Sequence, residues 1–162
     1  MLRGEIEQVL TALNQAEVLY LVVGGLAVVL HGHLRTTMDL DLVVRLQEEN
    51  LGRALDALQD LGYASVLPVP LSQLADPAIR DMWIREKNMI AFSLWNPGQP
   101  LFKLDILVSE PFDFASTYQR SVQVTLGATK ARVVSLDDLI DLKRQSGRPQ
   151  DLADIDALET IR

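Results

Sequence analysis

Apolar and polar residues follow two different periods along this chain. Residues 5–16 carry apolar side chains three or four positions apart, which predicts an amphipathic helix that faces a core. Residues 17–23 form a continuous apolar run that ends at Gly24 and Gly25, as expected for a strand buried on both faces. The chain therefore begins with a helix followed by a central strand.

The rest of the chain continues this mixture of helices and strands. Further strands are predicted at residues 38–44, 88–95, 101–108, 121–126 and 131–134. Further helices are predicted at residues 26–31, 47–61 and about 77–86, then after Ser135 and up to about Ile161. No repeat or linker divides the chain. We expect residues 1–162 to form a single α/β (α+β) domain, with a small mixed sheet flanked by helices and with helices at the C-terminus.

Two aspartates share one face of the strand predicted at residues 38–44. Alternation along this strand turns Met38, Leu40 and Leu42 one way and Asp39 and Asp41 the other. Residues two apart on a strand lie about 6.5 to 7 Å from each other, so that the two carboxylates can converge on metal ions. Repulsion between them is costly unless solvent or cations relieve it, and Mg²⁺ is a suitable cation.

Asp105 is the candidate third carboxylate. In the strand at 101–108 the alternate apolar residues are expected to face the core, which turns Lys103 and Asp105 to the other side. A second interpretation leaves Asp105 as a strand residue paired with Lys103 or Arg132.

Other residues suit the binding of a triphosphate. Gly24 and Gly25 lie where a strand gives way to a helix, with free backbone N–H groups and no Cβ to obstruct a phosphate. Arg35 can reach triphosphate oxygens with its guanidinium, and Thr37 can hydrogen-bond nearby. Lys143 stands above an apolar helix stripe and can point inward, although pairing with Asp137 or Asp141 is the alternative.

These motifs, in this order and spacing, resemble the nucleotidyltransferase superfamily that includes DNA polymerase β. The segment 35–42 and the ending 139–152 look more specifically like small bacterial nucleotidyltransferases of the abortive-infection type. The resemblance implies that Asp39 and Asp41 bind Mg²⁺, with a two-ion site expected. It also implies that Asp105 binds one ion and acts as the base on an acceptor hydroxyl that attacks the NTP, with release of pyrophosphate.

The resemblance leaves the acceptor open, as a protein, an RNA end or a small molecule. A second hypothesis is a catalytically silent binding module, such as one component of a toxin–antitoxin pair. The complete set of three aspartates favours the enzyme. Dinucleotide binding is disfavoured, because the sequence after Gly24 lacks the third glycine of that fingerprint.

The composition of the chain limits the classes of partner and the cellular locations that we expect. The formal net charge of −7 disfavours extended nonspecific binding to nucleic acid. The absence of cysteine excludes disulfides and thiolate metal sites, and the apolar runs are too short to cross a bilayer. We expect a cytoplasmic protein with an NTP and an acceptor as its partners.

Overall fold

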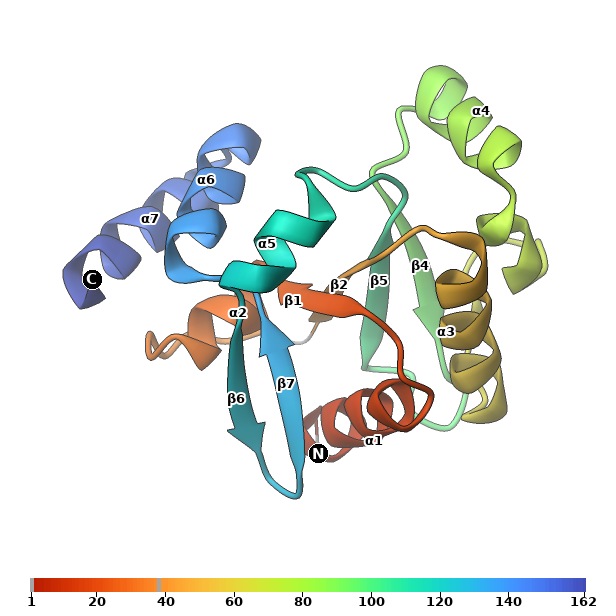
Figure 1. The fold of residues 1–162 in the computed structure, drawn as a ribbon, viewed down its shortest axis with the longest axis horizontal. Coiled ribbons are helices and arrows are strands. Elements are labelled where there is room, and N and C mark those ends of the chain that lie inside the picture. Colours follow the sequence, from red (N-terminus) through yellow and green to blue (C-terminus); the bar gives the residue numbers. More distant parts are fainter. Residues whose placement is uncertain (1, 38) are drawn as a thin grey trace.

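The computed structural model describes residues 2–37 and 39–162 and contains a seven-stranded mixed sheet with helices packed around it (Figure 1). This confirms the predicted fold class. Met38, which the sequence places at the start of the second strand, lies outside the described residues. None of the helices in the described part of the chain is long and apolar enough to cross a membrane.

The elements follow the predicted order with shifted ends. The strands are β1 (Tyr20–Val23), β2 (Asp39–Val44), β3 (Ala64–Ser65), β4 (Ala91–Trp95), β5 (Lys103–Leu107), β6 (Val122–Leu126) and β7 (Thr129–Val133). The helices are α1 (Leu2–Gln15), α2 (Gly24–Leu30), α3 (Glu48–Asp60), the 3₁₀ helix η1 (Leu71–Ala75), α4 (Pro77–Lys87), α5 (Phe114–Arg120), α6 (Leu136–Ser146) and α7 (Pro149–Ile161).

No element was predicted between residues 62 and 76, where the structure has β3 and η1. Three further segments differ from the sequence prediction for identifiable reasons. Glu17 adopts a positive φ of 56° in the connection after α1, so that the first strand begins at Tyr20. Asn88 has a φ of 50° and ends α4, and the next strand begins only at Ala91. Helix α5 was not predicted, because seven residues are too short for a clear apolar period. The sequence signal for this helix is Asp113, whose side chain caps the N-terminus by accepting a hydrogen bond from Ser116 N.

The strand order β3-β4-β5-β2-β1-β7-β6 puts β2 near the middle of the sheet. Strand β2 pairs antiparallel with β1 and parallel with β5. The parallel neighbour comes from a distant part of the chain, which joins two acidic segments separated by more than sixty residues. The sheet topology thus determines which carboxylates can meet.

The two faces of β2 and β5 have opposite chemistry. Leu40 and Leu42 of β2 and Leu104 and Ile106 of β5 are completely buried in the core. Helices α1 and α3, which pack against each other, contribute further buried residues to this core, among them Leu10, Leu13, Leu51 and Leu58. The polar residues of both strands therefore lie on the opposite face.

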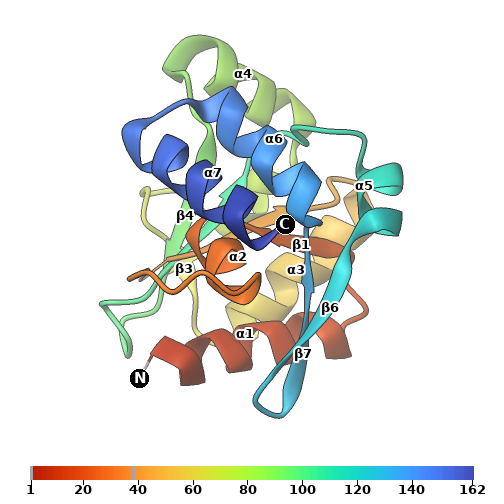
Figure 2. The same ribbon diagram turned by 90° about the vertical axis from the view of Figure 1, so that its left-hand side faces the viewer.

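Helices α2, α6 and α7 lie together beside the central strands. Helix α2 packs against β1, β2 and α6, and α6 packs against α7. Figure 2 shows α6 and α7 above α2, with α1 on the other side of α2. The C-terminal helices thus lie next to the segment at which β1 passes into α2.

Candidate active site

Asp41 and Asp105 lie side by side on the parallel pair β2–β5. Their Cα atoms are register partners, and Asp39 has Lys103 as its partner on the same two strands. On the other side of β2, Val23 is the register partner of Asp41, immediately before Gly24. The structure therefore brings the three predicted aspartates and the glycine pair to one place on the sheet.

The surroundings of Asp41 oppose its ionised form. Burial raises the pKa of Asp41 to about 6, and the negative charges of Asp105 and Asp39 add to this effect. Lys103 and Lys143 lower the pKa by smaller amounts. The carboxylates therefore form an electrostatically unfavourable group that a cation would stabilise.

Asp105 has two neighbours, one of which, Ser93, the sequence did not predict. The Ser93 hydroxyl donates a hydrogen bond of 2.6 Å to Asp105 Oδ1, across the β4–β5 pair. Lys103 Nζ lies 3.4 Å from Asp105 Oδ2. The expected pairing with Lys103 is thus present, whereas Arg132 stacks over the ring of Tyr118 instead. Ser93 is a new candidate residue, which orients Asp105.

Gly24 and Gly25 permit the close approach of the groups around them. Gly24 has a φ of +71°, and a Cβ at this position would collide with the Asp41 carboxylate. A Cβ on Gly25 would lie 3.0 Å from Thr37 Oγ1 and 3.3 Å from the guanidinium carbon of Arg35. The turn thus lies close to Thr37 and Arg35, and the binding of phosphate by these residues stays a prediction.

Lys143 points inward but has different partners from those expected. Its side chain is 6% exposed, and its Nζ lies 3.2 Å from Asp151 Oδ1 and 2.9 Å from Asp154 Oδ2. The alternative partners in α6 have other contacts, since Asp137 pairs with Arg162 and Asp141 with Arg144. The proposed pairing of Lys143 with Asp137 or Asp141 is therefore wrong.

Two acidic residues of α7 connect the cations of this region. Asp154 is fully buried, and its Oδ2 also lies 2.6 Å from Arg35 Nη1. Asp151 Oδ2 lies 2.9 Å from Arg148 Nε. We refer to Arg35, Lys143, Arg148, Asp151 and Asp154 as the α7 ion network. The sequence offered one signal for it, namely two acids three positions apart on the face of α7 that also buries Ile155 and Leu158.

A cavity of about 640 Å³ is lined by these groups. Its lining includes the glycine pair, the aspartates, Arg35, Thr37, Lys143 and Arg148. A cavity of this size is in the range that binds small molecules and nucleotides. Every site residue predicted from the sequence lines it.

Carboxylate oxygens are the ligands that Mg²⁺ prefers, so the donor chemistry of Asp39, Asp41 and Asp105 fits this ion. The structural observation that favours a cation here is the register of Asp41 with Asp105, whose negative charge together with burial raises the pKa of Asp41. Within residues 2–37 and 39–162, no group of three or more His, Cys, Asp or Glu side chains is arranged to hold a metal in the orientations present. The assignment of the three aspartates as Mg²⁺ ligands stays a prediction.

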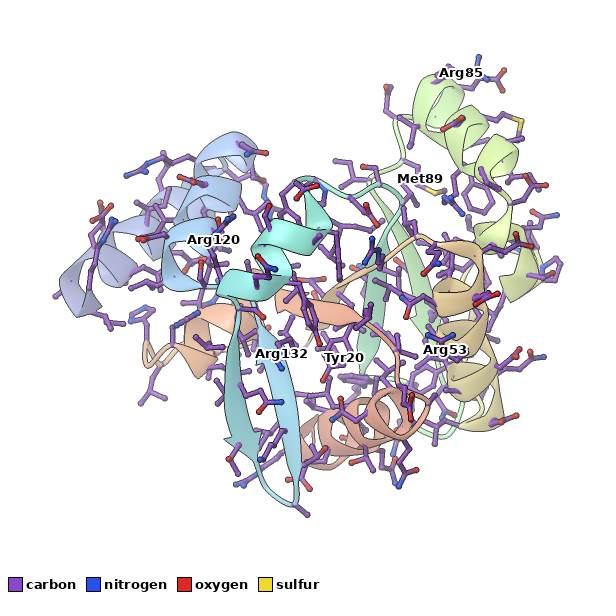
Figure 3. All side chains as sticks on the ribbon, viewed as in Figure 1. Tyr20, Arg53, Arg85, Met89, Arg120 and Arg132 are labelled. Carbon is purple, nitrogen blue, oxygen red and sulfur yellow. The ribbon has the colours of Figure 1, made fainter. Side chains whose placement is uncertain are left out.

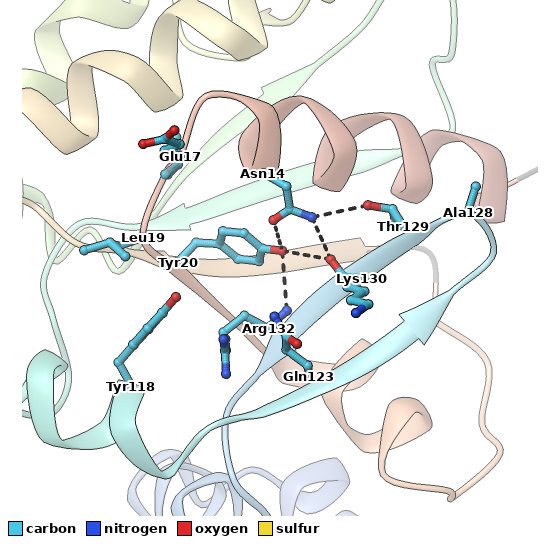
Figure 4. A pocket seen from close by; sticks show the side chains of 11 residues that line it. Asn14, Glu17, Leu19, Tyr20, Tyr118, Gln123, Ala128, Thr129, Lys130 and Arg132 are labelled. Carbon is cyan, nitrogen blue, oxygen red and sulfur yellow. Dashed lines mark hydrogen bonds between the residues drawn. The ribbon is translucent and has the colours of Figure 1, made fainter.

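Another cavity, of about 660 Å³, lies at the far end of β1 (Figure 4). Its polar groups bond to each other: the Tyr20 hydroxyl contacts Asn14 and Lys130, and the Arg132 N–H donates to it. Tyr20 and Arg132 lie close together near the base of the β6–β7 hairpin (Figure 3). These bonds explain the structural role of Tyr20 and do not indicate a reaction centre.

Solved structures similar to this chain include antibiotic adenylyltransferases. A crystal structure of the lincosamide antibiotic adenylyltransferase LnuA with lincomycin bound is 18% identical, with a TM-score of 0.63 over 98% of this chain and 97% of that one. A crystal structure of ANT(2")-Ia in complex with adenylyl-2"-tobramycin is 15% identical, with a TM-score of 0.58 over 98% and 93%. At such identities, the likeness establishes the fold.

An antigenic nucleotidyltransferase-like protein from Paracoccidioides brasiliensis has the same fold, with 20% identity and a TM-score of 0.56 over 97% of this chain and 74% of that one. No curated protein matches the chain at a significant level. The chain belongs to the family described as nucleotidyltransferase of unknown function (DUF6036), whose model matches residues 1–162. The superfamily expected from the sequence is thereby confirmed, and the abortive-infection subtype stays a prediction.

Proposed function

We propose that this protein is an Mg²⁺-dependent nucleotidyltransferase that transfers a nucleoside monophosphate from an NTP to a hydroxyl group of a small molecule. The observation that carries the proposal is the register of Asp41 with Asp105, beside Asp39 and the glycine pair. Three mutually repelling carboxylates next to a glycine turn are costly for a fold and useful for binding cations and phosphates.

Different residues of the cavity bind different parts of the NTP. The backbone N–H groups of Gly24 and Gly25 and the Thr37 hydroxyl donate to phosphate oxygens, and the Arg35 guanidinium supplies a forked cationic contact. Lys143 carries three N–H donors, and its pairs with Asp151 and Asp154 leave one for a phosphate. The α7 ion network holds these cations in position.

Asp105 is the proposed base. It accepts the proton of the acceptor hydroxyl as that oxygen forms a bond to the α-phosphorus, and the bond from the α-phosphorus to the bridging oxygen of pyrophosphate breaks. The hydrogen bond from Ser93 holds Asp105 Oδ1, so the proposed base is Oδ2, which lies 3.4 Å from Lys103 Nζ. Bound Mg²⁺ would neutralise the charge that develops on the phosphate oxygens and on pyrophosphate.

A small molecule suits this site better than a macromolecule. The three aspartates lie in a cavity that is also lined by residues of α6 and of the start of α7. The chain carries a net charge of −7, which disfavours the binding of nucleic acid. The structure of the lincosamide antibiotic adenylyltransferase LnuA has lincomycin bound, and that of ANT(2")-Ia is a complex with adenylyl-2"-tobramycin. We expect the reaction in the cytoplasm, where NTPs are available.

Labelled substrate tests the proposal. The protein is incubated with each α-labelled NTP, Mg²⁺ and the small-molecule fraction of a cell extract, and labelled products are separated. We expect label in a new product with the wild type, none with Asp105→Asn, and normal transfer with the exposed control Asp56→Asn. NTP binding without transfer to any fraction would favour the silent binding module, including a toxin–antitoxin component.

A further inference from the structure

Part of the lining of the cavity that contains the aspartates is apolar. Leu107 follows Asp105 by two residues on β5, so that both side chains lie on the same face of the strand. Ala91, the register partner of Leu107, comes from β4, and Ile90 precedes it. Pro111 and Leu142, from the segment after β5 and from α6, also line the cavity. We refer to these five residues as the apolar wall.

The apolar wall begins next to the proposed base. Asp105 is the register partner of Ser93, and Leu107 and Ala91 form the next pair on this face. An acceptor whose hydroxyl reaches Asp105 can therefore place the adjoining part of the molecule against Leu107 and Ala91. Ile90 at the edge is 76% exposed, which leaves a large apolar side chain in contact with water.

The charges of the cavity do not favour a cationic acceptor. The carboxylates that line its described part are Asp39, Asp41, Asp105 and Asp151. Asp151 pairs with Lys143 and Arg148, and the other three form the proposed cation site. None of the five residues of the apolar wall carries a charge, so an ammonium group placed there would lose water without gaining a partner.

We infer that the apolar wall binds the acceptor, and that the acceptor is a small uncharged hydroxyl compound with an apolar portion beside the reacting hydroxyl. This inference rests on the proposed function, since it names the substrate class of the same site. Polycationic hydroxyl compounds are disfavoured by the absence of carboxylates on this wall. The preference is a property of the side chains of β4, β5 and α6.

Binding of simple probes tests the inference without requiring turnover. The protein, labelled at Ile and Leu methyls and loaded with Mg²⁺ and a non-hydrolysable ATP analogue, is titrated with hexyl β-D-glucopyranoside, methyl β-D-glucopyranoside and tobramycin. We expect the hexyl compound to shift the methyls of Ile90, Leu107 and Leu142. It should bind at least about tenfold more tightly than the methyl compound, because burial of its extra methylenes is favourable.

Two matched variants test whether the hexyl compound binds at the apolar wall. Ile90→Asp places a charge on the apolar wall and should weaken binding of the hexyl compound at least about fivefold. Leu101→Asp is the control, because Leu101 is equally exposed at 76% and is not among the residues that line the cavity. Both positions are exposed, so both variants should fold.

Three results would overturn the inference: equal affinity for the hexyl and methyl compounds, tighter binding of tobramycin with shifts at the same methyls, or equal effects of the two variants. Nonspecific attraction of tobramycin to this acidic chain is recognised by shifts elsewhere. The proposed function is tested separately by the amide signals of Gly24 and Gly25 on addition of the ATP analogue and Mg²⁺. Failure there, with the methyl shifts intact, would contradict the proposed function alone.

Discussion

Asp41 and Asp105 are register partners on two parallel strands that are far apart in the sequence. Neither residue has a basic register partner on that face, and Val23 and Ser93 complete the row across β1 and β4. Burial and the neighbouring negative charges raise the pKa of Asp41 to about 6. The pair is therefore a local cost to the fold that a bound cation would remove.

Replacing Asp41 should stabilise the protein when no divalent cation is present. The folded-state pKa of Asp41 lies above its ordinary value of 3.8, so that at pH 7.5 the ionised form opposes folding. In EDTA at this pH, we expect Asp41→Asn to raise the free energy of unfolding by about 2 kcal/mol. Urea denaturation measures the change.

The same variant should behave differently with ligand. Addition of Mg²⁺ and ATP should stabilise the wild type, since a ligand at one hundred times its dissociation constant contributes about 2.7 kcal/mol. Asp41→Asn should gain little and transfer no nucleotide. A variant that is less stable than the wild type in EDTA would show that the carboxylate supports the fold, contrary to our account.

Gly24→Ala should abolish nucleotide transfer. The new Cβ would collide with the Asp41 carboxylate, and an alanine with φ near +71° is strained. We expect a loss of at least about a hundredfold in kcat/KM, with about 1 to 3 kcal/mol of lost stability. Kinetics with labelled ATP, together with circular dichroism to confirm folding, measure both effects.

Gly52→Ala is the matched control for this substitution. Gly52 lies in α3, where an added Cβ meets nothing within 4 Å, so alanine should stabilise the helix by roughly 0.5 to 1 kcal/mol and leave activity unchanged. Similar activities for the Gly24 and Gly52 variants would contradict the role of the glycine turn.

Removal of the charge of Asp154 should affect both stability and NTP binding. Asp154 Oδ2 lies 2.6 Å from Arg35 Nη1 and 2.9 Å from Lys143 Nζ, and Asp154 is fully buried. Asp154→Asn leaves these cations with a weaker partner, and we expect a loss of about 3 kcal/mol in stability. Calorimetry should also show at least about tenfold weaker binding of ATP, because Arg35 is no longer held.

Asp156→Asn is the control that tests whether the losses of stability and ATP affinity depend on the α7 ion network. Asp156 is an exposed residue of the same helix, and its substitution should change neither stability nor ATP affinity. If the Asp154 variant lost stability and bound ATP normally, the ion network would have a structural role alone.

Asp151 should make stability depend on pH in the acid range. Burial opposes its ionisation most strongly, but hydrogen bonds from Arg148, Ser146 and Lys143 outweigh it and lower the pKa of Asp151 to about 2. Because the folded-state pKa is below the unfolded value of 3.8, the stabilisation is complete above pH 4 and is lost as the pH falls toward 2. It amounts to at most about 2.4 kcal/mol.

Comparison with Asp151→Asn isolates this contribution from general acid unfolding. The difference in the free energy of unfolding between wild type and variant should be constant from pH 7 to pH 5 and should shrink between pH 4 and pH 2. A difference that stays constant down to pH 2 would contradict the lowered pKa.

The sequence predicted the fold class and most elements because their signals are local. Apolar period, glycine turns and the alternation around Asp39, Asp41 and Asp105 depend on residues close together in the chain. The short helix Phe114–Arg120 and the turn at Glu17 lack such a period, since their conformations depend on a capping side chain and a positive φ. These were missed or misplaced.

The site was predicted less completely, because its contacts are long-range. Alternation could turn Asp105 outward but could not place β5 beside β2, which depends on how the whole sheet assembles. For the same reason the partners of Lys143 were wrong, since Asp151 and Asp154 reach it from another helix. Ser93 carries no distinguishing sequence signal, and its hydrogen bond to Asp105 follows from the β4–β5 register.

A measurement of cation binding is the most direct test of the claim that the three aspartates form a shared cation site. Mn²⁺, which accepts the same oxygen ligands as Mg²⁺, can be titrated into the protein in the presence of ATP and followed by electron paramagnetic resonance. We expect saturable binding by the wild type and by Asp56→Asn, and at least about tenfold weaker binding by Asp41→Asn and by Asp105→Asn. Equal Mn²⁺ affinity in all four proteins would contradict a shared cation site at these aspartates.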